Sequence, residues 1–234
     1  MLSAPRRLVH FTMQLVSGIL ITRGRQQWAA QALECFLSQT YPEKELVIVD
    51  DMDDVSFPVP PKYPNVSHVI LRDRLAIPQK RNHGVRISTG ELIANFDSDD
   101  WSAPTRLAEQ VKLLEESHMS ITGYHSLLFY SAEYGVWKFV GRSQFPMGTS
   151  LLFTREFWSR HPFERDPNSE NEHTGEDGMF SRAARQENAV ISIDAESRMV
   201  ARIHPGNTSV KNIHDRSHQE WHRWTGGLPT GFTP

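Results

Sequence analysis

Three carboxylates fall within four residues in the stretch NFDSDDW, residues 95–101. The apolar run before it, residues 91–96, is typical of a buried strand, and Ser102 and Pro104 behind it predict the start of a helix. In open α/β sheets, ligands bind outside the carboxyl ends of the strands. Carboxylates this close repel each other unless a cation lies among them, and hard divalent ions prefer oxygen ligands. The stretch therefore predicts either a metal site at a strand end or a solvated acidic turn that caps the next helix.

Upstream of this stretch, apolar segments of strand length alternate with a segment of helical spacing. Residues 15–21 and 45–49 form short apolar runs, and residues 28–37 carry apolar side chains at the helical period. The second run ends in two carboxylates, Asp50 and Asp51. A strand, a helix and a strand with short links predict a right-handed βαβ unit. Residues 66–71 are expected to form a further strand and residues 78–88 a helix.

Downstream, residues 107–114 have the spacing of a helix, and the segments 121–130 and 134–140 alternate as two strands of a hairpin would. We also expect a strand at 150–153, a helix at 176–186 and mostly extended chain at 189–203.

The C-terminal segment 213–234 contains three histidines, His214, His218 and His222, that recur every four residues. This spacing places them on one face of a helix, with tryptophans beside that face. We expect an amphipathic tail helix that docks on the body of the protein or closes over a substrate site. A three-histidine zinc site is the less favoured alternative, because such sites usually draw ligands from more than one element.

The bulk composition limits the class of protein. The 234 residues suit a single domain, and the net charge of −3 provides no overall basic field for nucleic acid, although a local basic patch stays open. The single cysteine, Cys35, excludes an intramolecular disulfide and is expected to be a small core residue. No apolar run approaches the roughly 20 residues of a membrane span. We therefore expect a soluble, cytoplasmic protein.

Short motifs follow one another along the chain in a recognisable order. They are FLSQTYP with ELVIVDD at 36–51, RN at 81–82, GELI at 90–93, DSDD at 97–100, PTRL at 104–107, GTSLLF at 148–153, GED at 175–177 and HPGNTS at 204–209. In this order the chain resembles the family 2 glycosyltransferases, over roughly residues 14–210. The resemblance implies a glycosyltransferase A-type α/β fold with a central mixed sheet flanked by helices. It also implies a single catalytic domain, with a Rossmann-like nucleotide-sugar half at about 14–118 and an acceptor half at about 119–212.

The resemblance also implies a binding site for the donor. Thr22, Arg23 and Arg25 would grip the base and ribose at the end of the first strand, although the family usually has Tyr where Arg23 stands and Asn where Gly24 stands. Asp51 would accept a hydrogen bond from the imide of uracil. Arg81, with Lys80 as its weaker rival, would contact the diphosphate. The complete implied donor site is Thr22, Arg23, Arg25, Asp51, Arg81, Asp97 and Ser98.

A metal site and a general base are implied in the same way. Asp97, Asp99 and His204 would hold Mn²⁺ or Mg²⁺, while Asp100 would orient a water or the donor sugar. Asp177 would be the general base. The remaining implied roles fall to Glu176, which would hold an acceptor hydroxyl or the sugar, and to Asn207, Thr208 and Ser209, which would shape the loop over the phosphates.

The Glu176–Asp177 pair has a competing interpretation. Thr174 followed three residues later by Asp177 is also a capping-box pattern. A capping carboxylate at a helix N-terminus has a lowered pKa and is a weaker base. The sequence leaves both interpretations open.

The function implied is an inverting transfer of a sugar from a nucleoside-diphosphate donor, with UDP weakly favoured, to a hydroxyl acceptor. The acceptor could be a glycan or, with less support, a modified DNA base. One alternative is a nucleotidyltransferase, which would want a glycine-rich phosphate loop, whereas residues 22–25 supply one glycine only. The other alternative is a non-catalytic protein that binds nucleotide sugars.

Overall fold

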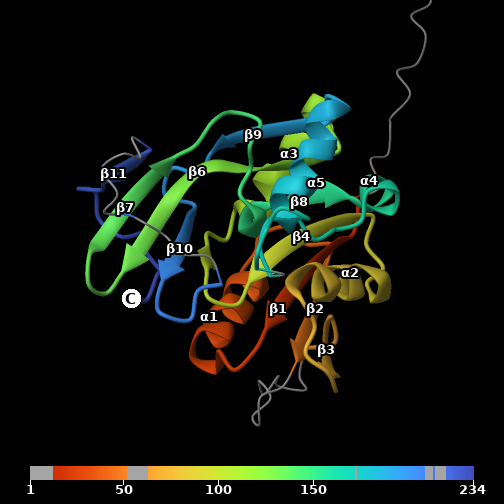
Figure 1. Cartoon of the computed structure of the whole chain (residues 1–234), viewed down its shortest axis with the longest axis horizontal. Helices are drawn as coiled ribbons and strands as arrows, with labels where there is room; N and C mark the ends of the chain where they lie inside the picture. Colours follow the sequence, from red (N-terminus) through yellow and green to blue (C-terminus); the bar gives the residue numbers. More distant parts are fainter. Residues whose placement is uncertain (1–12, 52–62, 172, 209–212, 214–219) are drawn as a thin grey trace, which may run out of the picture.

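The computed structural model describes residues 13–51, 63–171, 173–208, 213 and 220–234. Within them, eleven strands form one mixed sheet, and its main path runs β11-β7-β6-β8-β4-β1-β2-β3. Helices cover both faces of this sheet (Figure 1). The expected α/β class with a central mixed sheet is confirmed.

The N-terminal half of the sheet is parallel. Its strands are β1 (Val16–Thr22), β2 (Lys44–Asp51), β3 (Val66–Leu71) and β4 (Leu92–Asp97), linked by helices α1 (Gln26–Leu37) and α2 (Ile77–Ile87). β1 lies between β2 and β4, with Thr22 beside Asp50 and Ile21 beside Asp97. The register therefore brings three carboxyl ends, and the polar residues that follow them, to one edge of the sheet.

The other half is largely antiparallel and is built around the long strand β6. Its strands are β5 (Trp101–Ser102), β6 (Ile121–Ser131), β7 (Gly135–Val140), β8 (Leu152–Thr154), β9 (Val190–Asp194), β10 (Met199–Ile203) and β11 (Trp221–Arg223). Its helices are α3 (Arg106–Ser117), the 3₁₀ turn η1 (Gly148–Ser150), α4 (Arg155–Arg160) and α5 (Glu176–Gln186). β6 and β7 form the expected hairpin, whose turn ends at Gly135 with φ +76°.

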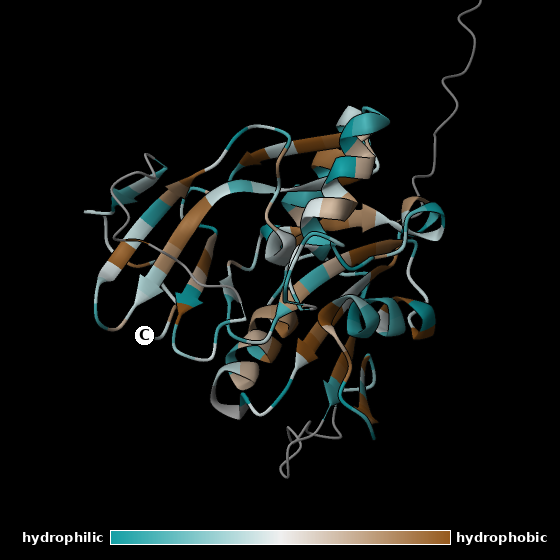
Figure 2. Ribbon diagram, in the orientation of Figure 1, coloured by the Kyte–Doolittle hydropathy of each residue, from teal (hydrophilic) through white to brown (hydrophobic). Residues whose placement is uncertain are grey.

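Strand β1 shows why the central strands are mostly apolar. Val16 and Leu20 face α1 and α3, whereas Ile19 and Ile21 face α2 and α5 on the other side of the sheet. Both faces are covered, so no position of this strand favours a polar exposed side chain. Figure 2 shows hydrophobic colour along the central strands, whereas helix α2 beside them is mostly hydrophilic in colour. At Gly18 a Cβ atom would lie 2.8 Å from the ring of Phe36, so α1 packs closely here because the strand has no side chain.

Two boundaries differ from the expectation drawn from the acidic stretch. Ser102 and Pro104 do not open a helix, because Trp101 and Ser102 pair with β10 as strand β5, and α3 begins only at Arg106. The tertiary pairing with a strand almost 100 residues later in the sequence overrides the local capping signal.

The expected tail helix over 213–234 is wrong for the residues that the structure describes. His222 lies in strand β11, which pairs antiparallel with β7, and residues 220–234 contain no helix. Trp221 packs its ring against Phe129 and Phe139, with centroids 4.9 and 5.0 Å away. This aromatic cluster and the hydrogen bonds to the edge of β7 favour a strand over a helix for residues 221–223. His214 and His218 lie outside the described residues.

Cys35 is buried, as expected for a small core residue, and burial raises the pKa of its thiol to about 11. None of the helices in the described part of the chain combines the length and the apolar character needed to cross a membrane.

Candidate active site

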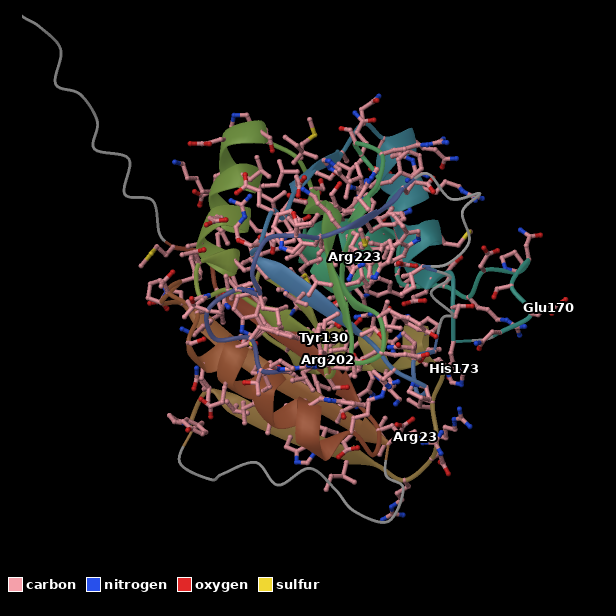
Figure 3. All side chains as sticks on the ribbon, turned by 90° about the vertical axis from the view of Figure 1, so that its left-hand side faces the viewer. Arg23, Tyr130, Glu170, His173, Arg202 and Arg223 are labelled. Atoms are coloured by element: carbon pink, nitrogen blue, oxygen red, sulfur yellow. The ribbon has the colours of Figure 1, made fainter. Side chains whose placement is uncertain are left out.

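A cavity of about 980 Å³ opens at the carboxyl edge of the parallel strands. Its wall is formed by loops that follow β1, β4 and β10, by the end of β2 and by the start of α5. Figure 3 shows two cavity residues, Arg23 and His173, toward the same side of the molecule. The lining includes every residue for which the sequence implied a site role: Thr22, Arg23, Arg25, Asp51, Arg81, Asp97, Ser98, Asp99, Asp100, Glu176, Asp177, His204, Asn207 and Thr208, whereas Ser209 lies outside the described residues.

The centre of the acidic stretch is buried, and Asp97 and Asp100 beside it are half-buried. Asp99 is 6% exposed, and the neighbouring Ser98 is 2% exposed. Asp100 accepts a hydrogen bond from the Thr149 hydroxyl (2.5 Å) and one from the backbone N–H of Arg202 (3.2 Å). Burial, followed by the charges of Asp99 and Asp97, raises the pKa of Asp100 well above its ordinary value. The interpretation as a solvated acidic turn is therefore wrong.

Arginines of the chain itself compensate the charge of this cluster. Arg81 Nη2 lies 3.0 Å from Asp97 Oδ1, and Arg25 Nη1 lies 2.7 Å from Asp99 Oδ2. These arginines compensate Asp97 and Asp99, but the charges of both still raise the pKa of Asp100. The repulsion within the cluster is therefore relieved only in part by the chain itself, and a metal role needs further evidence.

Asp99 receives further donors from the loop that follows β10. His204 Nε2 lies 2.9 Å from Asp99 Oδ2, and Asn207 Nδ2 lies 3.4 Å from the same oxygen. The backbone N–H of Gly206 donates to His204 Nδ1 (3.1 Å), so Nδ1 is unprotonated and Nε2 carries the proton donated to Asp99. Burial alone would raise the pKa of Asp99, but the His204 hydrogen bond and the Arg25 charge outweigh it and hold this pKa below its ordinary value. The imidazole also contacts the ring of Trp28, with the centroids 4.0 Å apart and the two planes tilted by 36°.

A hard divalent ion at this edge would have Asp97, Asp99 and His204 as its nearest candidate ligands. In the described part of the chain, no group of three or more His, Cys, Asp and Glu side chains is placed to hold one. Neighbouring ligands of an octahedral Mg²⁺ lie about 3 Å apart, since each bond is about 2.1 Å long, and the hydrogen-bonded atoms Asp99 Oδ2 and His204 Nε2 are 2.9 Å apart. For Nε2 to become a ligand, its proton would have to leave or move to Nδ1. Mg²⁺ is commonly held by one or two carboxylates together with substrate phosphates. Asp99 and His204, with Asp97 nearby, therefore fit an ion that a diphosphate helps to bind.

Arg81 is only 3% exposed and links two carboxylates across the cavity wall. Besides Asp97, it contacts Glu176, with Nε 3.4 Å from Oε1. Its third nitrogen, Nη1, is buried and has no hydrogen-bond partner among the described residues. Arg81 itself belongs to the cavity lining, so this guanidinium has one donor that its carboxylate partners do not use.

Asp51 is 2% exposed, and both of its carboxylate oxygens already have donors. Oδ1 pairs with the Lys80 ammonium, and Oδ2 accepts the backbone N–H of Leu75 (3.1 Å). Lys80 also donates to the carbonyl of Thr22 (3.2 Å). Lys80 therefore lies between the ends of β1 and β2. The Thr22 hydroxyl beside it is buried and has no hydrogen-bond partner in the described part of the chain.

The Glu176–Asp177 pair starts helix α5, but not as a capping box. The N-cap is Gly175 at φ +89°, and the Thr174 hydroxyl bonds to Ser169 and Asn171 instead. Glycine takes this left-handed conformation without strain, which threonine would not. The capping interpretation of Thr174 is therefore wrong.

The two carboxylates of this pair have different surroundings. Asp177 accepts backbone N–H groups at both oxygens, from Gly148 (3.1 Å) and Gly178 (2.8 Å). Glu176 is 5% exposed. Burial, reinforced by Asp177 and opposed by Arg81, raises the pKa of Glu176 to about 7.

Three cavity contacts were missed by sequence reasoning. Thr149 holds Asp100, Trp28 supports His204, and Arg202 donates its backbone N–H to Asp100. Thr149 lies in the GTSLLF motif, which marks this segment as part of the family pattern but does not indicate that Thr149 bonds to Asp100. Arg202 pairs in register with Tyr130 of β6, and the two lie close together in Figure 3. A backbone contact of this kind leaves no signal in the residue type.

Comparison with known proteins decides the family. The model of glycosyl transferase family 2 matches residues 17–189. The chain belongs to glycosyl transferase family 2. Among curated relatives, the putative glycosyltransferase EpsE of Bacillus subtilis is 33% identical over 132 residues, which are 52% of this chain and 45% of that protein. An Escherichia coli relative, UDP-Glc:alpha-D-GlcNAc-diphosphoundecaprenol beta-1,3-glucosyltransferase WfaP, is 28% identical over 106 residues, 44% of this chain and 42% of its own. The matched regions thus span less than half of these relatives.

Solved structures of glycosyltransferases share the fold. S. aureus TarS in complex with UDP-GlcNAc superposes with a TM-score of 0.66 at 18% identity, covering 83% of this chain and 60% of that one. The mannosyltransferase PcManGT from Pyrobaculum calidifontis, in complex with GDP-Man and Mn²⁺, superposes with a TM-score of 0.60 at 17% identity, covering 82% and 57%. The expected glycosyltransferase A-type fold is confirmed.

Proposed function

We propose that this family 2 member transfers a sugar from a nucleoside-diphosphate donor to a hydroxyl acceptor, with inversion and with the help of Mn²⁺ or Mg²⁺. The observation that carries the proposal is that Arg81, the Asp99–His204 pair and Asp177 line one cavity. A relative that uses UDP-Glc and neighbours solved with UDP-GlcNAc or GDP-Man and Mn²⁺ support the donor class and the ion.

In this proposal the donor's diphosphate lies over the acidic stretch. Arg81 Nη1 donates to a phosphate oxygen, since a guanidinium matches phosphate geometry. Asp99 and His204, with Asp97, hold the ion, which when bound neutralises charge on the leaving diphosphate. Thr22 and Asp51 lie at the ends of β1 and β2, where the base and ribose would bind.

The acceptor hydroxyl is activated by Asp177. Its carboxylate removes the proton as the oxygen attacks the anomeric carbon from the face opposite the leaving phosphate. A single displacement of this kind inverts the configuration. The backbone donors from Gly148 and Gly178 hold the Asp177 carboxylate in place, while Glu176 holds a hydroxyl of the acceptor or the sugar. General-base assistance is worth roughly 10²–10⁴-fold in rate.

The remaining parts of the proposal concern organisation and acceptor. Residues of about 14–118 form the nucleotide-sugar half and those of about 119–212 the acceptor half of one catalytic domain. A glycan is the favoured acceptor, because the net charge of −3 gives no support for DNA. The free, buried thiol of Cys35 is consistent with the cytoplasm as the proposed location.

A thermal-shift panel tests the proposal. UDP-glucose, UDP-GlcNAc and GDP-mannose are added with MnCl₂ or with EDTA, and we expect one of them to raise the melting temperature in MnCl₂ only, since ligands that bind the folded state stabilise it. Release of nucleoside diphosphate from that donor then separates an enzyme from a binding protein. Formation of a nucleotide sugar from UTP and a sugar 1-phosphate would instead indicate a nucleotidyltransferase. A panel without any shift would contradict the proposed donor class.

A further inference from the structure

Arg25 joins two loops across the cavity. It belongs to the loop between β1 and α1, and its Nη1 lies 2.7 Å from Asp99 Oδ2 in the loop after β4. Its Nη2 donates to the carbonyl of Gly206, 2.5 Å away in the loop after β10. The Arg25 side chain is 24% exposed and that of Asp99 is 8% exposed. The guanidinium thus lies at the cavity surface and covers a buried carboxylate.

Asp99 Oδ2, the oxygen that Arg25 contacts, has little capacity left to accept further hydrogen bonds or to bind a cation. Arg25, His204 and Asn207 all direct N–H groups at Oδ2. A carboxylate offers about four lone-pair sites over its two oxygens. A cation that approaches Oδ2 therefore competes with N–H groups for lone pairs, and it also meets the positive charge of Arg25 at short range.

The three donors differ in how they respond to an approaching ion. Asn207 is neutral, and His204 can itself become a ligand once Nε2 has given up its proton, because imidazole suits divalent ions. Arg25 can do neither, since a guanidinium stays charged and has no acceptor atom. Arg25 is consequently the donor that has to leave.

We propose that Arg25 is a resident counter-cation of Asp99, which a divalent ion displaces, and that the freed guanidinium then pairs with the donor's phosphates. The second step rests on the proposed function, whereas the displacement does not. When an ion binds alone, the protein loses the Arg25–Asp99 ion pair, and Arg25 gains no new anionic partner. When the ion arrives with a diphosphate, Arg25 gains a new anionic partner. Binding of ion and diphosphate is therefore coupled through this side chain.

Mn²⁺ titration followed by electron paramagnetic resonance tests the displacement, because it measures binding in the absence of any donor or turnover. We expect Arg25→Gln to bind Mn²⁺ at least tenfold more tightly than the natural chain. Arg74→Gln is the matched control, since Arg74 is another arginine of the cavity lining and its guanidinium bonds His173. This control should change Mn²⁺ affinity less than threefold.

Arg25→Lys provides a second variant that keeps the charge. Its single ammonium cannot form the two-armed bridge to Asp99 and Gly206, so its Mn²⁺ affinity should lie between those of the natural chain and Arg25→Gln. Unchanged or weaker Mn²⁺ binding by Arg25→Gln would overturn the proposal, and so would an equal gain in Arg74→Gln. Absence of Mn²⁺ binding in all four proteins would overturn it as well, because removing Arg25 should open Asp99.

The coupling is tested by repeating the titration with UDP. UDP should raise the Mn²⁺ affinity of the natural chain by a larger factor than that of Arg25→Gln, and equal factors would overturn the second step. If Arg25→Gln gains Mn²⁺ affinity but no nucleotide sugar binds or reacts, the proposed function fails while the displacement stands. If the natural chain transfers sugar but its Mn²⁺ affinity does not depend on Arg25, the displacement fails while the proposed function stands.

Discussion

Arg81 and Glu176 form a buried ion pair across the cavity wall, with Nε 3.4 Å from Oε1. The same guanidinium bonds Asp97 at the end of β4. Arg81 therefore connects the strand end proposed to hold the diphosphate to the helix start proposed to hold the acceptor. A change at either end of this connection is expected to be felt at the other.

Glu176→Gln should stabilise the fold at pH 8 and have little effect near pH 4. The pKa of Glu176 is raised from 4.5 to about 7 in the folded protein, so the folded state binds the proton more tightly than the unfolded state. The fold therefore loses stability as the pH rises from about 4.5 through about 7. The shift corresponds to up to about 3 kcal/mol, at 1.36 kcal/mol per pKa unit. Chemical denaturation at both pH values measures the difference.

Glu116→Gln serves as the control for this prediction, because its side chain is 65% exposed in a surface pair with Lys112. Its effect should stay within about 0.5 kcal/mol at both pH values. If Glu176→Gln were equally destabilising at pH 4 and pH 8, ionisation of Glu176 would not be the cause.

Asp177→Asn should lower kcat by roughly 10²–10⁴-fold and leave donor affinity almost unchanged, since it removes the proposed base and no donor contact. Asparagine keeps an oxygen that can accept from the Gly148 or the Gly178 N–H, so the start of α5 should remain intact. Steady-state kinetics with the donor identified by thermal shift, together with a donor titration, separate the two quantities. A variant with full turnover would assign the base elsewhere.

Asp99→Ala should abolish the part of donor binding that depends on Mn²⁺. The substitution removes one proposed ligand and leaves His204 and Arg25 without their shared partner. Isothermal titration of the donor in MnCl₂ and in EDTA gives the metal-dependent share. Asp194→Ala is the control, because Asp194 lies at the end of β9 in a surface pair with Lys138. Equal metal dependence in the natural chain and in Asp99→Ala would exclude the ligand role.

Trp221→Ala should destabilise the protein by about 2–3 kcal/mol, since a large aromatic ring leaves the Phe129–Phe139 cluster. His222→Ala, whose side chain is exposed on the same strand, should cost less than about 0.5 kcal/mol. Thermal or urea denaturation compares them. A helical tail with His222 on its docking face would reverse this order, so the experiment also checks the assignment of β11.

The order of strands and helices was predictable because the spacing of apolar residues along the sequence indicates most of the elements. The apolar runs that became β1, β2 and β4 are covered by helices on both faces, and such strands carry apolar residues at most positions. The start of α3 and the tail were mispredicted, because β5 and β11 exist only through partners distant in the chain. Short edge strands of two or three residues carry too little pattern to be recognised alone.

Residue types and motif order were by themselves enough to indicate the family and to identify the cavity residues from Thr22 to His204 as one set. Which of those charges neutralise one another was decided only by the folded chain. Arg25 and Asp99 are 74 residues apart and Arg81 and Glu176 are 95 apart, and local pattern carries no information over such distances. Charge pairing depends on separations of a few ångströms, which arise only when the sheet brings the ends of its strands together.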